Sequence, residues 1–183
     1  MLRKVTKGRG VVLQERAVRV VMSHQGVREG QRTELGLSAS LLGAGGKMWG
    51  DDAIIFYNAP AFDGSPGAVL LKGDLREGED EEIPIHLARI DSRTDSIRRA
   101  ISSFSERSPI DIGGVRGMSV RALDERSGEE PCRHDLTGDI SGCTSIGMAA
   151  IRRERDGGIR DAIDEPIETP IGGLEKVVKE YCR

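Results

Sequence analysis

The stretch LGLSASLLGAGGKMWGDDAIIFYNAP, residues 35–60, decides the fold expected for this chain. Every second residue from Leu35 to Leu41 is apolar, which is the period of a β-strand with one buried face. The segment GAGGK at residues 43–47 is rich in glycine and predicts a turn. The apolar run AIIFY at residues 53–57 then predicts a second, densely buried strand. The stretch is therefore expected to form a strand, a turn and a strand.

Similar short apolar segments recur along the rest of the chain. Residues 95–104 fit both one face of a helix and a strand, and residues 174–181 keep helical spacing. Many short strands separated by glycine-rich turns are typical of a sandwich. The sequence therefore predicts one all-β domain over residues 1–183, a β-sandwich of two antiparallel sheets with a short C-terminal helix. The other predicted strands are residues 11–13, 17–22, 83–90, 114–122 and 145–151.

The charge of the chain is small overall and uneven along its length. The 183 residues carry a net charge of −3. Residues 1–50 contain nine Lys/Arg and three Asp/Glu, whereas residues 51–91 contain three Lys/Arg and ten Asp/Glu. The two regions can attract each other, or the basic one can meet an acidic partner. Basic and aromatic side chains do not form an interleaved platform, so the sequence predicts no nucleic-acid partner.

Cysteine content and hydropathy predict a cytoplasmic protein. The three cysteines, Cys132, Cys143 and Cys182, are too few and too irregularly spaced for a disulfide framework or a zinc knuckle. Their odd number fits a reducing compartment. No apolar run approaches the length of a membrane span, and the N-terminus lacks the apolar core of a signal peptide.

Motifs for common enzyme chemistry are missing. The sequence GAGGKM departs from a phosphate-binding loop, because Leu41 stands where glycine is needed and Met48 where Ser or Thr is needed. Ser145 does not lie in a nucleophile elbow, because Cys143 occupies the position of the first glycine. The three histidines have no partners at the spacing of metal ligands. The sequence therefore does not predict an enzyme.

The strongest candidate for a site is the acidic segment KGDLREGEDEE at residues 72–82. Six Asp or Glu residues lie between Asp74 and Glu82, and Gly73 and Gly78 allow the backbone to turn. Calcium takes about six to eight oxygen ligands, many of them from carboxylates in flexible loops. The spacing is not that of an EF-hand. A solvated acidic turn without a metal is the alternative.

Blocks of residues along the chain match one family pattern. They are SA at 38–39, LLG at 41–43, GK at 46–47, DD at 51–52, IFYN at 55–58, GD at 73–74, GE at 78–79, DEE at 80–82, GGV at 113–115 and RHDL at 133–136. Their order from about residue 33 to the end is more specific than any single block. In these blocks the chain resembles the TerD family of tellurium-resistance and stress proteins, whose pattern includes D-L-D-A-S-A-x-L-L, F-I-F-Y-N and G-D-N-x-T-G-E-G-D-G-D-D-E.

The resemblance implies a β-sandwich that binds calcium between loops and has no assigned enzymatic activity. It also implies a bacterial protein of tellurite resistance or stress response. Its partners would be other tellurium-resistance and stress proteins, membrane-associated ones included, and it would be cytoplasmic, peripheral at the inner face of the membrane. The oligomeric state stays open. The calcium ligands carried over from the family pattern are Asp74, Glu79 and Asp80, with Glu34, Glu81 and Glu82 as weaker ones.

The chain departs from the family pattern at several ligand positions. Glu34 and Gly36 stand for the two aspartates of D-L-D, and Leu75 stands for the asparagine after G-D. The early G-W-D, expected near residues 23–25, lacks its aspartate. Calcium affinity rises with the number and charge of the ligands, so these losses are expected to weaken binding by orders of magnitude or to abolish one of two sites. A metal-free scaffold that meets a basic surface through the same loop is the alternative function.

The second half of the chain departs from the family as well. Where the family has an apolar strand, this chain has Ile97-Arg98-Arg99-Ala100-Ile101. Adjacent arginines in a strand cannot both avoid its buried face, and an unpaired buried charge is costly. The segment is therefore expected to lie at a sheet edge, or the domain is a degenerate copy.

A metal-assisted hydrolase that uses the same acids is a third hypothesis. It requires a general acid or base near the metal, and His86 is the histidine nearest to the acids in the sequence. The alternation of residues 83–87 turns His86 outward, which favours a solvated surface histidine instead.

Overall fold

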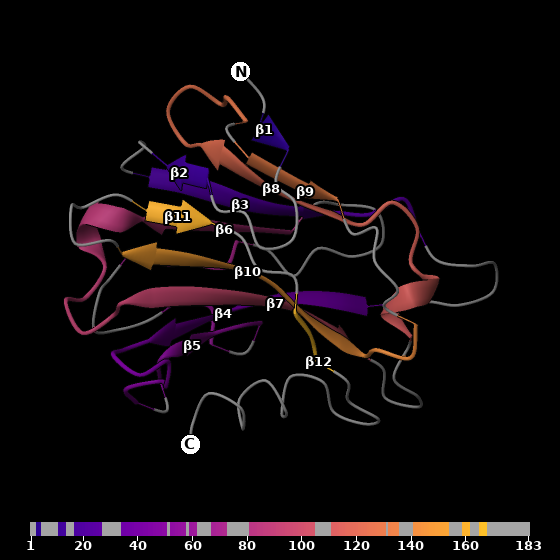
Figure 1. Cartoon of the computed structure of the whole chain (residues 1–183), viewed down its shortest axis with the longest axis horizontal. Coiled ribbons are helices and arrows are strands. Elements are labelled where there is room, and N and C mark those ends of the chain that lie inside the picture. Colours follow the sequence, from indigo (N-terminus) through magenta and orange to yellow (C-terminus); the bar gives the residue numbers. More distant parts are fainter. Residues whose placement is uncertain are drawn as a thin grey trace.

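Two β-sheets make up the part of the chain that the structure describes (Figure 1). The computed structural model describes residues 3–4, 11–13, 17–26, 34–50, 52–57, 59–61, 67–72, 81–104, 111–130, 132–135, 141–153, 159–161 and 165–167. The helical elements in these ranges are two single 3-10 turns, η1 (Leu87–Arg89) and η2 (Ile112–Gly114), and neither is long enough to cross a membrane. The predicted all-β sandwich is confirmed, whereas the predicted helix at residues 174–181 lies outside the described residues.

The first sheet has five strands in the order β1-β9-β8-β3-β6. Neighbouring strands are antiparallel except for β1 and β9, which run parallel. Strand β6 therefore forms one edge of this sheet. The strands are β1 (Arg3–Lys4), β9 (Cys132–Asp135), β8 (Ser119–Asp124), β3 (Ala17–Ser23) and β6 (Glu81–His86).

The second sheet has seven strands, six of them in the order β2-β11-β10-β7-β4-β5. The seventh, β12 (Glu165–Ile167), pairs with the opposite end of β10 from β11. All of its strand pairs are antiparallel. The other strands are β2 (Val11–Leu13), β11 (Ile159–Asp161), β10 (Ser145–Arg153), β7 (Ser96–Phe104), β4 (Glu34–Leu42) and β5 (Ile54–Ile55).

Several strands differ in length from their predictions, for local reasons. Strand β5 stops at Ile55, because Phe56 turns back and exchanges two backbone hydrogen bonds with Ala59 (3.0 and 2.9 Å). Strand β6 ends at His86 instead of continuing to residue 90, because the chain enters η1. The strand predicted from residue 114 begins only at Ser119, after η2 and a left-handed Gly117 with φ +61°. In all three places a turn of the backbone shortens the strand, although the apolar pattern continues into the turn.

The core lies between the two sheets and is built by alternate residues of their strands. From the first sheet, β3 contributes Val18 and Val20, and β6 contributes Ile83 and Ile85. From the second sheet, β4 contributes Leu37 and Leu41, and β7 contributes Ile97 and Ile101. All eight are at most 1 % exposed. Burial of such aliphatic side chains contributes about 1.5–3 kcal/mol each, so this layer is the main source of stability.

Arg99 lies in this core rather than at a sheet edge. Strand β7 is central, between β4 and β10, and Arg99 faces the same side as Ile97 and Ile101 with 1 % of its surface exposed. The expectation of an edge strand is therefore wrong. Arg98 takes the opposite face, as the alternation of a strand requires. The interior of the sandwich thus contains a guanidinium group as well as hydrocarbon.

The turn between β8 and β9 is organised by Asp124. Its Oδ1 accepts hydrogen bonds from the backbone N–H of Ser127 (2.5 Å) and of Arg126 (3.0 Å). These bonds, first of all that from the backbone of Ser127, hold the pKa of the Asp124 carboxyl below its usual range. The ionised carboxylate therefore stabilises the turn that joins two strands of the first sheet.

Replacing Asp124 with asparagine is expected to reduce the acid sensitivity of the fold. A carboxyl whose pKa is lowered by folding contributes stability above its unfolded pKa of about 3.9, and that stability is lost as the pH falls through the folded pKa. The thermal midpoint of Asp124→Asn should therefore lie below that of the wild type at neutral pH and converge with it as the pH falls through the folded pKa of Asp124. The matched variant Glu129→Gln, in the same turn, should run parallel to the wild type. A constant gap between Asp124→Asn and the wild type at all pH values would contradict this account.

Candidate functional site

The acidic loop predicted from the sequence begins and ends next to two paired residues, Lys72 and Glu82. Lys72 and Glu82 form an antiparallel bridge, and the Lys72 N–H donates to the Glu82 carbonyl at 3.0 Å. Val69 pairs with Ile85 further down the same two segments. Residues 73–80 therefore connect two backbone segments that are hydrogen-bonded to each other. The ends of the loop are thereby held at the edge strand β6.

Glu81 is a buried carboxylate at this base. It has the same orientation along β6 as Ile83 and Ile85, so its side chain enters the space between the sheets, and it is 4 % exposed. Its Oε2 accepts a hydrogen bond from the Leu37 N–H at 2.5 Å. Leu37 belongs to β4 of the other sheet. Strand β5 ends at Ile55, which pairs with Ala39, so β5 does not extend far enough to pair with Leu37. Glu81 thus ties the two sheets together where the ladder of β5 is too short to pair with β4.

Glu82 points to the opposite face of β6 and is held by two cations. Its Oε2 accepts from Arg19 Nη1 at 3.1 Å, and its Oε1 lies 3.7 Å from Lys72 Nζ. The side chains of Arg19, Lys72 and Glu82 are 32 %, 49 % and 23 % exposed. Both carboxylate oxygens of Glu82 therefore already face a positive charge of the same chain.

The other predicted calcium ligands are only partly placed. Glu34 is the first residue of β4, where it pairs with Phe104 of β7. Leu37, which donates to Glu81, lies three residues from Glu34, about 10 Å along β4. The structure therefore brings Glu81, Glu82 and the backbone of Glu34 to one end of the sandwich. Asp74, Glu79 and Asp80 lie outside the described residues.

His86 is remote from these acids. It ends β6, so it lies roughly 17 Å along the strand from Glu81. Its Nε2 is 3.5 Å from Glu125 Oε2, on the outer face of the first sheet. His86 is therefore badly placed as a general acid or base for a metal at the loop, which weighs against the hydrolase hypothesis.

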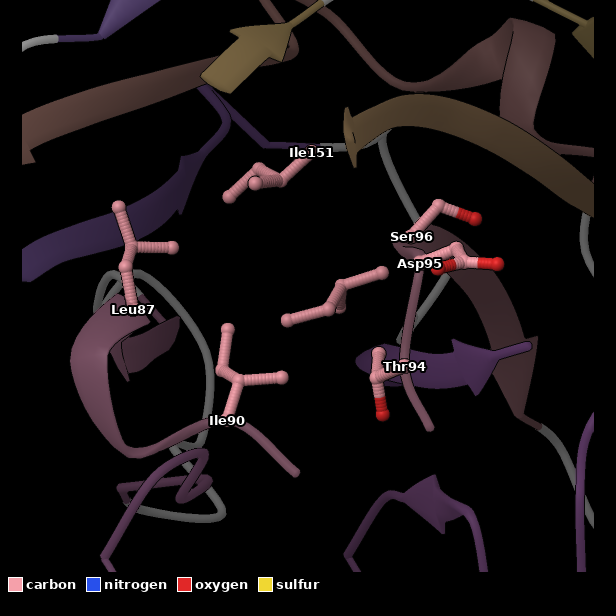
Figure 2. A pocket seen from close by; sticks show the side chains of 7 residues that line it. Leu87, Ile90, Thr94, Asp95, Ser96 and Ile151 are labelled. Carbon is pink, nitrogen blue, oxygen red and sulfur yellow. The ribbon is translucent and has the colours of Figure 1, made fainter. Parts of the chain in front are cut away.

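A small hollow lies at the same remote end (Figure 2). Leu87, Ile90 and Ile151 point toward one another across it, while the oxygens of Asp95 and Ser96 lie at its margin (Figure 2). The hollow holds about one water molecule. It does not gather converging polar groups from the described residues, so it offers no alternative site.

Arg19 and Lys72 are the site residues that sequence reasoning missed. Arg19 lies 63 positions before Glu82, and only the antiparallel pairing of β3 with β6 brings them together. The alternation in β3 does predict that Arg19 points outward, away from Val18 and Val20. It does not predict which strand lies beside β3, so the cluster could not be found without the topology.

Comparison with known proteins places the chain in a family. The model of the TerD domain matches residues 1–181. The tellurium resistance protein TerD of Serratia marcescens is 31 % identical over 158 residues, which are 84 % of this chain and 80 % of that protein. General stress protein 16U of Bacillus subtilis (strain 168) is 30 % identical over 157 residues, which are 83 % of this chain and 79 % of that protein.

Solved structures share the fold at lower identity. The crystal structure of SAV2460, a protein of unknown function, superposes with a TM-score of 0.70 at 18 % identity, covering 92 % of this chain and 95 % of that one. A homologue of the telluride resistance protein TerD, SCO6318 from Streptomyces coelicolor A3(2), gives a TM-score of 0.64 at 14 % identity, with 85 % and 92 % covered. These two structures show the shared fold. The TerD domain model and the two relatives at about 30 % identity show that this chain belongs to the TerD family of tellurium-resistance and stress proteins.

Proposed function

We propose that this chain is a non-enzymatic calcium-binding module of the bacterial tellurite-resistance or stress response. Calcium binds in the acidic loop above the Lys72–Glu82 base, and the ordered loop then presents a surface to a partner. The partners are other tellurium-resistance and stress proteins, some of them membrane-associated, and the module works in the cytoplasm at the inner face of the membrane. The observation that carries the proposal is the buried carboxylate of Glu81 at the hydrogen-bonded base of the loop.

The carboxylates of the acidic segment at residues 74–82 are donor chemistry that suits calcium. Carboxylate oxygens on a turning backbone are the ligands that calcium prefers. Within the described ranges no group of three or more His, Cys, Asp or Glu residues lies close enough to hold a metal, so the site depends on the loop itself. Glu81 would supply one oxygen, and Asp74, Glu79 and Asp80 would supply others. A bound calcium ion would offset the repulsion among these carboxylates.

A metal-free interaction scaffold is the second candidate function. The specific observation in its favour is the pair of cations on Glu82, which offsets part of the loop's negative charge without a metal. In that case the remaining acids meet a basic surface of a partner directly. Calcium dependence separates the two functions.

Calcium is expected to raise the thermal unfolding midpoint of chelator-stripped protein, because it binds the folded state. The stabilisation should reach about 2.7 kcal/mol when calcium exceeds its dissociation constant a hundredfold. Magnesium should have a much smaller effect, because it needs a tighter octahedral site and gives up its water reluctantly. The measurement is a calcium titration followed by differential scanning calorimetry.

Asp74→Asn is the matched variant for this titration, because it replaces one carboxylate of the loop with an uncharged amide of similar size. It is expected to lose most of the calcium shift while keeping the midpoint in chelator. If calcium at millimolar concentration does nothing that magnesium does not, the calcium-binding function is wrong and the scaffold function takes its place.

A further inference from the structure

The outer face of the second sheet is buried, although it faces away from the core. Leu37 and Leu41 of β4 and Ile101 of β7 point toward the first sheet, so the residues that alternate with them point the other way. The first sheet packs on the core side (Figure 1). The outward residues of β4, β7 and β10 are nevertheless at most 4 % exposed: Ser38, Ser40, Leu42, Ala100, Ser102 and Ser145.

The small side chains of this face cannot shield one another from water. The neighbours of Ser102 in the two adjacent strands are Gly36 and Ser145. Met48 packs on Leu42 at one end of the face, roughly 20 Å along the sheet from Ser102. Ser102 is nevertheless 0 % exposed. Its complete burial therefore requires another part of the chain above it.

The hydroxyl groups of this face are used within the sheet. Ser145 Oγ donates to Ser102 Oγ at 2.9 Å, and Ser38 Oγ donates to the Ala100 carbonyl at 3.3 Å. Polar groups that are already hydrogen-bonded can be covered at little cost. The face therefore suits a cover that brings larger apolar side chains and needs no polar partner from the sheet.

The C-terminal part of the chain begins beside this face. Strand β12 pairs with β10 so that Ile167 lies opposite Ser145, and residues 168–183 follow. Neighbouring strands lie about 4.8 Å apart, so β7 is roughly 10 Å and β4 roughly 15 Å from β12. An extended stretch as long as residues 168–173 covers up to about 20 Å. That length is enough to pass from the sheet edge onto the face.

The sequence of residues 174–181 has the complementary pattern. Leu174, Val177, Val178 and Tyr181 recur at the spacing of one helix face. Charged residues fall on the opposite face: Glu175, Lys176, Lys179 and Glu180. A helix of this length is about 12 Å long, close to the distance from β10 to β4. So short a helix is stable only when its apolar face packs against something.

We infer that the outer face of the second sheet is the docking surface of the chain's own C-terminal segment, residues 168–183. The apolar residues of the segment pack on the row of small residues that includes Ser38, Ala100 and Ser102. Small side chains let a helix approach the sheet closely, and the larger side chains of the segment fill the space above them. The face is thereby closed to other proteins unless the segment leaves it. The inference is independent of the proposed calcium site, because these residues lie outside the acidic loop.

The test uses the full-length variant Ser102→Cys, which places a thiol of similar size on the buried face. The rate at which a maleimide labels position 102 is compared with the rate for Ser92→Cys, where the side chain is exposed. Mass spectrometry locates the labels. Position 102 is expected to react roughly a hundredfold more slowly than position 92, since labelling requires local opening. Adding Leu174→Asp should accelerate labelling at position 102 roughly tenfold or more, because docking loses one buried leucine.

Two controls make the result specific to docking. Lys179→Asp places the same new side chain on the charged side of the segment and should leave labelling at position 102 unchanged. Cys132 and Cys143 are 4 % and 3 % exposed, and they should stay unlabelled as long as the sandwich is folded. If Leu174→Asp exposes these two thiols as well, Val178→Ala is measured in its place. It is a milder change on the same side of the segment, with the same direction of effect expected.

Each outcome decides the inference. Slow labelling at position 102 that accelerates with the change at Leu174 or Val178, but not with Lys179→Asp, supports it. Rapid labelling in the otherwise unchanged chain would show that the face is open, which overturns it. Slow labelling that stays slow in both segment variants also overturns it, because another part of the chain or a second copy must then cover the face. A rate that depends on protein concentration would identify the second copy.

Discussion

Replacing Ile101 with alanine is expected to lower the free energy of unfolding by about 2–5 kcal/mol. Ile101 is fully buried at the centre of β7, where it pairs with Leu37 of β4 on one side and with Ile146 of β10 on the other. The change removes three carbon atoms from a place where neighbouring strands are held by their ladders and cannot close the gap. Since domains of this size are stable by about 5–15 kcal/mol, the loss is a large part of the total.

The measurement is chemical denaturation of the wild type and the variant. The two unfolding free energies are compared with the same slope of free energy against denaturant concentration. Arg152→Ala is the matched control, because Arg152 lies on β10 beside Ile151 but is exposed. Its effect should stay within about 0.5 kcal/mol. Equal losses in both variants would mean that β7 is not the central strand of a packed sandwich.

Replacing Glu81 with alanine is expected to cost about 2–3 kcal/mol of stability in chelator, where calcium plays no part. The variant removes the carboxylate that accepts from the Leu37 N–H. Leu37 is 1 % exposed and Glu81 is 4 % exposed, so the N–H group stays buried. A buried donor that loses a charged acceptor cannot turn to water. The hydrogen exchange of the Leu37 amide should therefore accelerate together with the drop in stability.

Glu81→Gln separates the hydrogen bond from the charge. The amide oxygen of the glutamine can still accept a hydrogen bond from the Leu37 N–H. The loss of stability in this variant should therefore be less than half of the loss in Glu81→Ala. It should nevertheless weaken calcium binding, because it removes a carboxylate from the base of the loop. Equal destabilisation by Gln and Ala, with unchanged exchange of the Leu37 amide, would mean that Glu81 does not tie the sheets together through this bond.

The local pattern of the sequence predicted most strands, because alternation and turn residues act over a few neighbouring positions. Strand β4, the turn after it and strand β10 follow directly from such signals. The ambiguous segment at residues 95–104 is a strand because β4 and β10 pair with it on both sides, a choice that its own spacing leaves open. Tertiary pairing resolved there what the local pattern left open.

The fate of Arg99 shows the same limit. The prediction of an edge strand assumed that a buried guanidinium is too costly for a central one. The register of β7 between two apolar strands outweighed that cost, because shifting the strand by one residue would turn Ile97 and Ile101 out of the core. One charged side chain was therefore carried inside with its strand.

The sequence by itself determined the fold class, the family and the position of the acidic loop, since these depend on composition, alternation and the order of residues. Only the tertiary structure decided what stands at the base of that loop. Glu81 and Leu37 are 44 positions apart, and Arg19 and Glu82 are 63 apart. These contacts depend on which strands become neighbours, and strand order is set by the packing of the whole sandwich rather than by any local stretch of the chain.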